Sequence, residues 1–169
     1  ILIEPYACAK HAVDRAQVTP TDIVVQAGVG CLGLGMVGYL KMHSPQKLVV
    51  LDLKDDRLKT AKEFGADVVI NPSKEDAVKA IMDMTDGYGC DIYIEATGHP
   101  ASVKQGMDMI RKLGRFVEFS VFGAETTLDW SVIGDVKELD LLGAHLSPYC
   151  FPPVIEWISN GKLPTKGVV

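Results

Sequence analysis

Three glycines and one carboxylate have the types and spacing to hold a phosphate and a sugar. Gly28, Gly30 and Gly33 follow a short apolar run, and Asp52 ends a second apolar run about 20 residues beyond the last glycine. The first glycine permits a tight turn, the second lets the backbone approach a diphosphate, and the third lets a helix lie close to a strand. A carboxylate at the position of Asp52 accepts hydrogen bonds from ribose hydroxyls and repels a 2′-phosphate. The pattern therefore predicts dinucleotide binding, with NAD preferred over NADP.

The main-chain N–H groups of the helix that follows would complete this site. Helix N-termini present unpaired N–H groups and the positive end of the helix dipole to anions. The amides of Gly30, Cys31, Leu32 and Gly33 are therefore predicted to hold the diphosphate. Glycine spacing alone is a weak indicator, because purely structural glycine turns are common. The preceding strand, the following helix and the second strand make the prediction much more specific.

Two of the charged residues near the turn have a second interpretation. Asp52 could cap the next helix, although Asp55 and Asp56 are better placed to do so. Arg57 could lie over an adenine ring or could be an ordinary solvated arginine on a helix surface. The residue pattern leaves both alternatives open for Arg57.

Strand-like and helix-like segments alternate along the whole chain. The strands are expected at residues 23–26, 47–51, 68–70, 91–95, 115–120 and 139–144. The helices are expected at residues 5–15 and 32–42, from Asp55 or Asp56 to Gly65, from a capping box at 73–76, from Pro100 to Gly114, and at 153–159. Strands separated by helices pair in parallel through crossovers. The expected fold is therefore α/β, a Rossmann-type doubly wound parallel six-stranded sheet with helices on both faces.

Length and composition limit the other possibilities. The 169 residues suit one domain, and no apolar run is long enough to cross a bilayer. A net charge of −5 disfavours a general nucleic-acid partner. The four cysteines lack paired C-x-x-C spacing, which indicates reduced, mostly buried thiols in a cytoplasmic protein rather than a self-contained zinc site. Both ends look cut, so we expect a connecting helix at 1–16 and a nucleotide-binding domain at 17–169, both from a longer enzyme.

Several segments together resemble one enzyme family. They are Glu4-Pro5, Leu51-Asp52-Leu53, Arg57-Leu58, residues 64–71 and residues 91–98. With the glycine turn, they resemble the zinc-dependent medium-chain alcohol and polyol dehydrogenases, most nearly the sorbitol and threonine dehydrogenase branch. The resemblance covers essentially the whole chain, but it corresponds only to the family's cofactor-binding domain and the helix that leads into it.

The resemblance implies roles for further residues. It places Ala96, Thr97 and Gly98 beside the cofactor. It also implies that two backbone segments face the nicotinamide carboxamide, one formed by Val121 and Phe122 and the other by Ala144, His145 and Leu146. Residue chemistry alone predicts instead that Val121 and Leu146 belong to the core and that His145 is a partly buried structural histidine.

Glu4 is the one residue that could link this chain to a metal. The resemblance places it in the neighbourhood of a catalytic zinc, whereas residue chemistry alone favours a carboxylate at a helix N-terminus. Catalytic zinc needs about three protein ligands and an open position, so Glu4 cannot hold it alone. In a complete enzyme, zinc would polarise the alcohol oxygen and hydride would pass to NAD. The chain by itself is expected to bind NAD and to catalyse nothing.

Three other functions remain as alternatives. A zinc-free relative of the quinone reductases is disfavoured by Glu4 and Asp52, and a methyltransferase is disfavoured because no antiparallel edge strand is apparent. A module that senses NAD(H) and regulates a partner is the non-enzymatic alternative. Residues 139–146 could form a homo-oligomer contact through the sheet edge.

Overall fold

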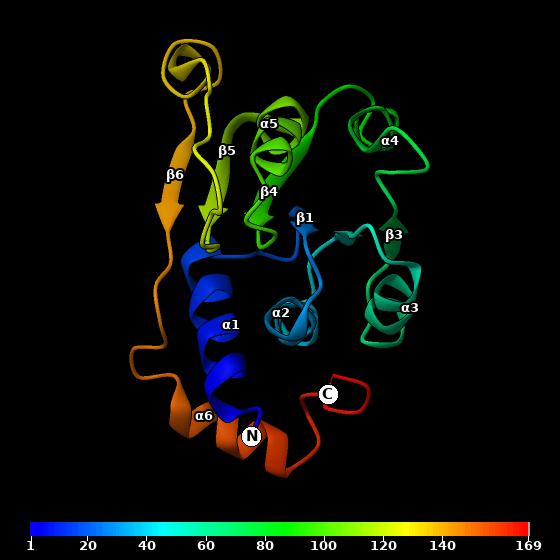
Figure 1. The fold of residues 1–169 in the computed structure, drawn as a ribbon, viewed down its shortest axis with the longest axis vertical. Coiled ribbons are helices and arrows are strands. Elements are labelled where there is room, and N and C mark those ends of the chain that lie inside the picture. The colour runs from blue at the N-terminus through cyan, green and yellow to red at the C-terminus, as the bar shows by residue number, and fades with distance from the viewer. Residues whose placement is uncertain (169) are drawn as a thin grey trace.

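Six parallel strands form the centre of the molecule (Figure 1). The computed structural model describes residues 1–168. The strand order is β3-β2-β1-β4-β5-β6, and all five pairings are parallel. The strands are β1 (Ile23–Ala27), β2 (Lys47–Leu51), β3 (Val68–Ile70), β4 (Cys90–Glu95), β5 (Ile110–Glu118) and β6 (Asp140–Gly143). The expected doubly wound sheet is confirmed.

Helices cover both faces of this sheet (Figure 1). They are α1 (Ile3–Ala16), α2 (Cys31–Met42), α3 (Asp55–Glu63), α4 (Ala77–Met84), α5 (Pro100–Met109) and α6 (Phe151–Ser159), with a short 3₁₀ helix η1 (Trp130–Val132). The helices α1, α2 and α3 lie on one face, and α4 and α5 lie on the other. Successive crossovers to opposite faces leave a crevice where the strand order reverses, between β1 and β4.

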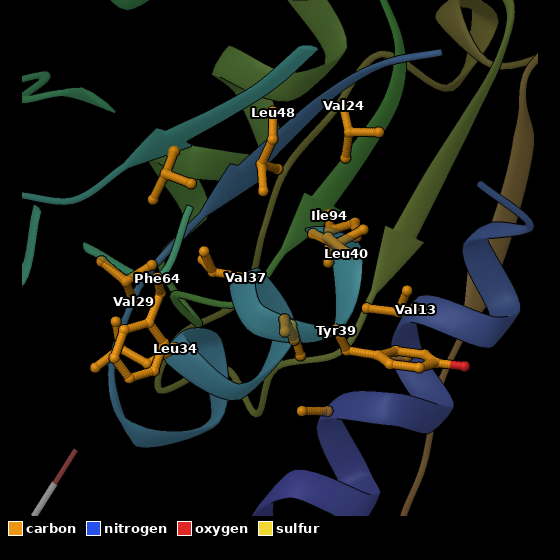
Figure 2. Packing of buried hydrophobic residues seen from close by; sticks show 14 of the residues in the cluster. Val13, Val24, Val29, Leu34, Val37, Tyr39, Leu40, Leu48, Phe64 and Ile94 are labelled. Carbon is orange, nitrogen blue, oxygen red and sulfur yellow. The ribbon is translucent and has the colours of Figure 1, made fainter. Parts of the chain in front are cut away.

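The helices α1 and α2 pack against the sheet to form the larger core (Figure 2). Val37 and Leu40 of α2 are fully buried, as are Val24 and Leu48 in the neighbouring strands. The apolar run of each central strand is buried on both faces, which is typical of parallel sheets. No helix among residues 1–168 is both long enough and apolar enough to cross a membrane.

The boundary between α5 and β5 differs from the expected one. The helix ends at Met109, and the next residue, Ile110, already begins β5, whereas the sequence predicted a helix closed by Gly114 and a strand from 115 to 120. The pairing with β4 shifts register between Ile110 and Arg115. Leu113 within this irregular segment has a positive φ of 57°. A bulge of this kind cannot be seen in hydropathy, because the residues of the bulge alternate neither as a strand nor as a helix.

The beginnings of α3 and α4 also correct the expectation. The Asp76 side chain caps α4 by accepting the Lys79 N–H at 3.0 Å, and Ser73 instead donates to Asn71 in the preceding turn. The predicted capping box at 73–76 is therefore wrong in its first residue. At α3, neither Asp55 nor Asp56 is the N-cap, because both lie in the first helical turn.

Candidate cofactor-binding site

The crevice at the β1–β4 switch point contains a cavity of about 520 Å³. Open α/β sheets bind ligands at this position, beyond the carboxyl ends of the strands. Six of the predicted site residues line the cavity, namely Gly28, Gly30, Asp52, Arg57, Ala96 and Thr97. Five of them follow the ends of three adjacent strands, β2, β1 and β4, and Arg57 lies in α3. The fold thus brings together the glycine turn, the acidic residue and the segment after β4.

Two glycines of the turn are required by backbone geometry. Gly28 has a φ of 94°, and a Cβ there would lie 2.5 Å from the Ala96 carbonyl oxygen. A Cβ on Gly33 would lie 2.2 Å from the Gly28 carbonyl oxygen. A side chain at Gly28 would push the turn away from the segment after β4, and one at Gly33 would push α2 away from the turn. The tight turn predicted at Gly28 and the close helix–strand approach predicted at Gly33 are therefore both present.

Gly30 differs from the other two because its missing side chain faces open space. Apart from Gly30 and its two chain neighbours, no atom of residues 1–168 lies within 4 Å of where its Cβ would be, and Gly30 lines the cavity. Gly30 is also the N-cap of α2, and no side chain caps the first-turn N–H groups of that helix. The first-turn residues Cys31 and Leu32 are exposed. A cradle without a side chain beside unpaired N–H groups is the geometry that suits a diphosphate.

The Asp52 carboxylate lines the cavity and is fixed by backbone donors. Its Oδ2 accepts the Val29 N–H and its Oδ1 accepts the Lys54 N–H, both at 2.9 Å. The guanidinium of Arg57 lies 3.8 Å from Oδ2. Each carboxylate oxygen can accept more than one hydrogen bond, so the group keeps capacity for a diol. The alternative that Asp52 merely caps α3 does not describe these contacts, since one of them reaches back to the glycine turn.

The segment after β4 is held in place by a buried carboxylate. Glu95 is fully buried, and its Oε1 accepts the Thr97 N–H at 2.9 Å while Oε2 accepts the Gly98 N–H at 3.2 Å. Gly98 has a φ of 70°, and a Cβ there would lie 2.6 Å from the Val121 carbonyl oxygen. The loops that follow β4 and β5 therefore touch through their backbones.

Nine predicted residues do not line this cavity: Cys31, Leu32, Gly33 and Gly98, which adjoin residues that do, and five residues farther along the chain. Phe122 lines a separate cavity between α5, β5 and the segment before η1, whereas the remaining four line neither cavity: Val121, Ala144, His145 and Leu146. Val121 is 95% exposed and Leu146 is 59% exposed, so the interpretation of both as core residues is wrong. His145 is exposed as well, against the partly buried structural histidine that residue chemistry favoured. These residues follow the ends of β5 and β6, where the chain leaves the layers of the core.

Several lining residues were not predicted from the sequence: Leu53, Lys54, Pro72, His99, Ala101, Ser102 and Gln105. His99 is the N-cap of α5, where its Nδ1 accepts the Ala101 N–H at 3.2 Å. Its position directly before Pro100 was an available signal, because proline is favoured in the first turn of a helix. Which side of α5 faces the crevice depends on packing and leaves no local signal.

The residues present do not make a zinc site. No group of three or more histidine, cysteine, aspartate or glutamate side chains gathers anywhere in residues 1–168. Glu4 lies in the first turn of α1, where its Oε1 accepts a hydrogen bond from the Cys8 thiol at 3.1 Å. Burial, followed by the contact with Glu4, raises the pKa of Cys8 to about 11, so this thiol stays protonated. All four cysteines are free, and three are buried while Cys31 is exposed, as expected in outline.

Glu118, whose orientation the sequence left open, lines the second cavity with one carboxylate oxygen buried and unpartnered by the described residues. Burial raises its pKa above 4.5, and the charge of Glu95, its neighbour across the β4–β5 pairing, adds to this. A carboxyl group with a raised folded-state pKa destabilises the fold once it ionises, above the unfolded value.

Glu118→Gln is therefore expected to raise Tm at pH 7 by about 2 °C, a modest effect because the side chain is only partly buried. The gain should shrink as the pH falls toward 4, where the wild-type carboxyl is protonated in both states. Thermal melts at pH 4, 5.5 and 7 would measure it. An equal gain at all three pH values would show that ionisation of Glu118 is not the cause.

The strand order and the crevice together define a dinucleotide-binding type of α/β domain. A family model described as zinc-binding dehydrogenase matches residues 31–160. The chain belongs to the zinc-binding dehydrogenase family. It is 54% identical to an erythritol/L-threitol dehydrogenase of Mycolicibacterium smegmatis over 95% of this chain and 44% of that protein. It is 30% identical to a sorbitol dehydrogenase of Bacillus subtilis over 99% of this chain and 48% of that protein.

Solved structures match over a similar share of this chain and of their own length. An alcohol dehydrogenase from Escherichia coli CFT073, complexed with NADH, superposes with a TM-score of 0.87 at 30% identity, over 96% of this chain and 48% of that one. A zinc-binding dehydrogenase from Sinorhizobium meliloti, bound to NADP, gives a TM-score of 0.90 at 25% identity, over 96% and 48%. The chain thus spans a little under half the length of the relatives it matches.

Proposed function

We propose that this chain is the NAD(H)-binding domain of a zinc-dependent dehydrogenase that transfers hydride between an alcohol or polyol and NAD. The observation that carries the proposal is the open space at Gly30 beside the uncapped N-terminus of α2, with Asp52 lining the same cavity. NAD supplies the hydride acceptor or donor when it is bound. The polyol class is supported by the relatives, which are named erythritol/L-threitol and sorbitol dehydrogenases.

The residues of the chain would bind and orient the cofactor. The amides of Gly30, Cys31, Leu32 and Gly33 would hold the diphosphate, and the Asp52 carboxylate would accept the hydroxyls of the adenosine ribose. Ala96 would line the path toward the nicotinamide together with Thr97 and Gly98, which Glu95 fixes. For the carboxamide we propose the exposed segments after β5 and β6, that is, Val121, Phe122, Ala144, His145 and Leu146.

The wider context of the domain is also a proposal. Residues 1–16 would connect a catalytic domain to the NAD-binding domain at 17–169, and the zinc ligands would come from that other domain, with Glu4 in the zinc neighbourhood. We propose a cytoplasmic enzyme that associates with a second copy through the sheet edge. Support for the association comes from β6, an edge strand with three of its four residues exposed.

Purified chain is expected to bind NADH but to oxidise no alcohol. Fluorescence titration with NADH, and assays with erythritol, sorbitol and threonine in the presence of NAD and Zn²⁺, would test both parts. Absence of NADH binding would overturn the cofactor assignment. Measurable oxidation of any of the three substrates would overturn the division of labour between this domain and a second one.

Asp52 is expected to make the wild-type chain bind NADH more tightly than NADPH. Asp52→Ser should weaken NADH binding about tenfold, because the loss of a charged hydrogen-bond acceptor costs about 1.4 kcal/mol of binding free energy. The same change should strengthen NADPH binding, since it removes a negative charge and leaves Arg57 and Lys54 beside the ribose. Titrations of both cofactors against wild type and the variant would measure the ratio.

Asp56→Ser is the matched control, because Asp56 is exposed in the first turn of α3 and does not line the cavity. It should leave both affinities unchanged. Tighter binding of NADPH than of NADH by the wild-type chain would contradict the assignment of Asp52.

A further inference from the structure

A buried amide lies directly beneath the glycine turn. Gln26 is fully buried in β1, a strand that is otherwise apolar. Its Nε2 donates to two backbone carbonyls of the turn, that of Gly28 at 3.0 Å and that of Gly33 at 2.8 Å. These contacts fix the orientation of the amide, because the opposite orientation would set an oxygen against two carbonyl oxygens. One side chain therefore ties the start of the turn to the first turn of α2.

The peptide group between Gly28 and Val29 is held from both of its ends. Its carbonyl oxygen accepts from Gln26, and its N–H donates to Asp52 Oδ2 at 2.9 Å. Because a peptide group is planar, fixing the carbonyl also fixes the direction of the N–H. The orientation of this single peptide group therefore links Gln26 in β1 to the carboxylate after β2.

Filling space does not account for Gln26. Its Oε1 is buried and finds no hydrogen-bond donor among the described residues. A buried acceptor without a partner is destabilising, and an apolar residue in the same place would avoid that cost. The two N–H contacts to the turn are what an apolar residue could not supply.

We infer that Gln26 is a positioning residue for the cofactor site: it orients the Gly28–Val29 peptide group and thereby couples the diphosphate-binding turn to the ribose carboxylate Asp52. This inference rests on the proposed NAD(H) function. Gln26 does not line the cavity, so its effect on a ligand must pass through the turn.

Gln26→Met keeps an unbranched side chain of similar length and removes both hydrogen bonds. It is expected to weaken ADP-ribose binding about tenfold, measured calorimetrically at a temperature where the chain is fully folded. The double variant with Asp52→Ser should bind less weakly than the two single effects predict, because both act on the same peptide group. In the free chain, amide hydrogen exchange at Val29 should accelerate. Gln46→Met, at an exposed position between α2 and β2, is the control and should change none of these.

Gln26→Glu separates positioning from general destabilisation. A carboxylate would face two carbonyl oxygens, whereas a protonated carboxyl can donate one hydrogen bond. ADP-ribose affinity of this variant should therefore rise at least threefold from pH 8 to pH 5.5 relative to wild type, while Gln26→Met follows wild type across that range. Wild-type affinity in Gln26→Met, or fully additive effects with Asp52→Ser, would overturn the inference. A wild-type chain that does not bind ADP-ribose would overturn the proposed function, and the inference with it.

Discussion

Replacing Gly30 with valine is expected to abolish NAD(H) binding while the fold stays intact. The new side chain would project into the cavity, since nothing lies within 4 Å of the Cβ position. It would occupy the space that the diphosphate needs beside the N-terminus of α2. We expect the Kd for NADH to rise at least a hundredfold, which corresponds to about 2.7 kcal/mol. Fluorescence titration would measure the change, and a thermal melt should give a Tm within about 2 °C of wild type.

Gly134→Val is the matched control for this change. Gly134 also has open space where its Cβ would be, but it lies in the turn after η1 and lines neither cavity. The control should bind NADH as wild type does. Normal NADH binding by Gly30→Val would mean that the diphosphate does not lie at this turn.

Gly33→Ala is expected to damage the fold itself. Its Cβ would lie 2.2 Å from a backbone oxygen, and backbone cannot move aside as a flexible side chain can. Relief requires α2 to shift away from β1, which also breaks the hydrogen bond from Gln26 to the Gly33 carbonyl. Overpacking of this kind costs about 3 kcal/mol, which lowers Tm by roughly 6–12 °C in a chain of this size. NADH affinity should fall as well, because the first turn of α2 moves.

Thermal melts of Gly33→Ala and Gly134→Ala would measure the difference. The second variant adds the same methyl group in open space, so its Tm should stay close to that of wild type. An unchanged Tm in Gly33→Ala would show that α2 is not as close to the strand as the structure has it.

The elements that carry local signals were predictable from the sequence. The six strands, their parallel pairing and the conformation of Gly28 follow from apolar runs, helical spacers and the steric freedom of glycine. The position of Asp52 follows from the length of one strand-helix-strand unit. These features depend on residues close together in the chain, so short-range rules are sufficient for them.

Contacts between distant segments could not be predicted in the same way. The bonds of Gln26 to the turn, and of Asp52 to Val29, depend on how three strand ends meet. The exposure of Val121 was missed because hydropathy does not say where a chain leaves the core after a strand ends. The bulge between Ile110 and Arg115 depends on the pairing partner β4, which no local pattern records.

The reversal of strand order at β1–β4 has a mechanical consequence. Gly28 and Asp52 belong to the β1–β2–β3 half of the sheet, and Thr97 and His99 belong to the β4–β5–β6 half. A dinucleotide bound across the crevice between β1 and β4 would contact both halves of the sheet and hold them together. A free dinucleotide concentration of 100 times Kd adds about 2.7 kcal/mol to the free energy of unfolding. With the dinucleotide bound, the two halves of the sheet should therefore unfold together as one unit under mechanical force or during proteolysis.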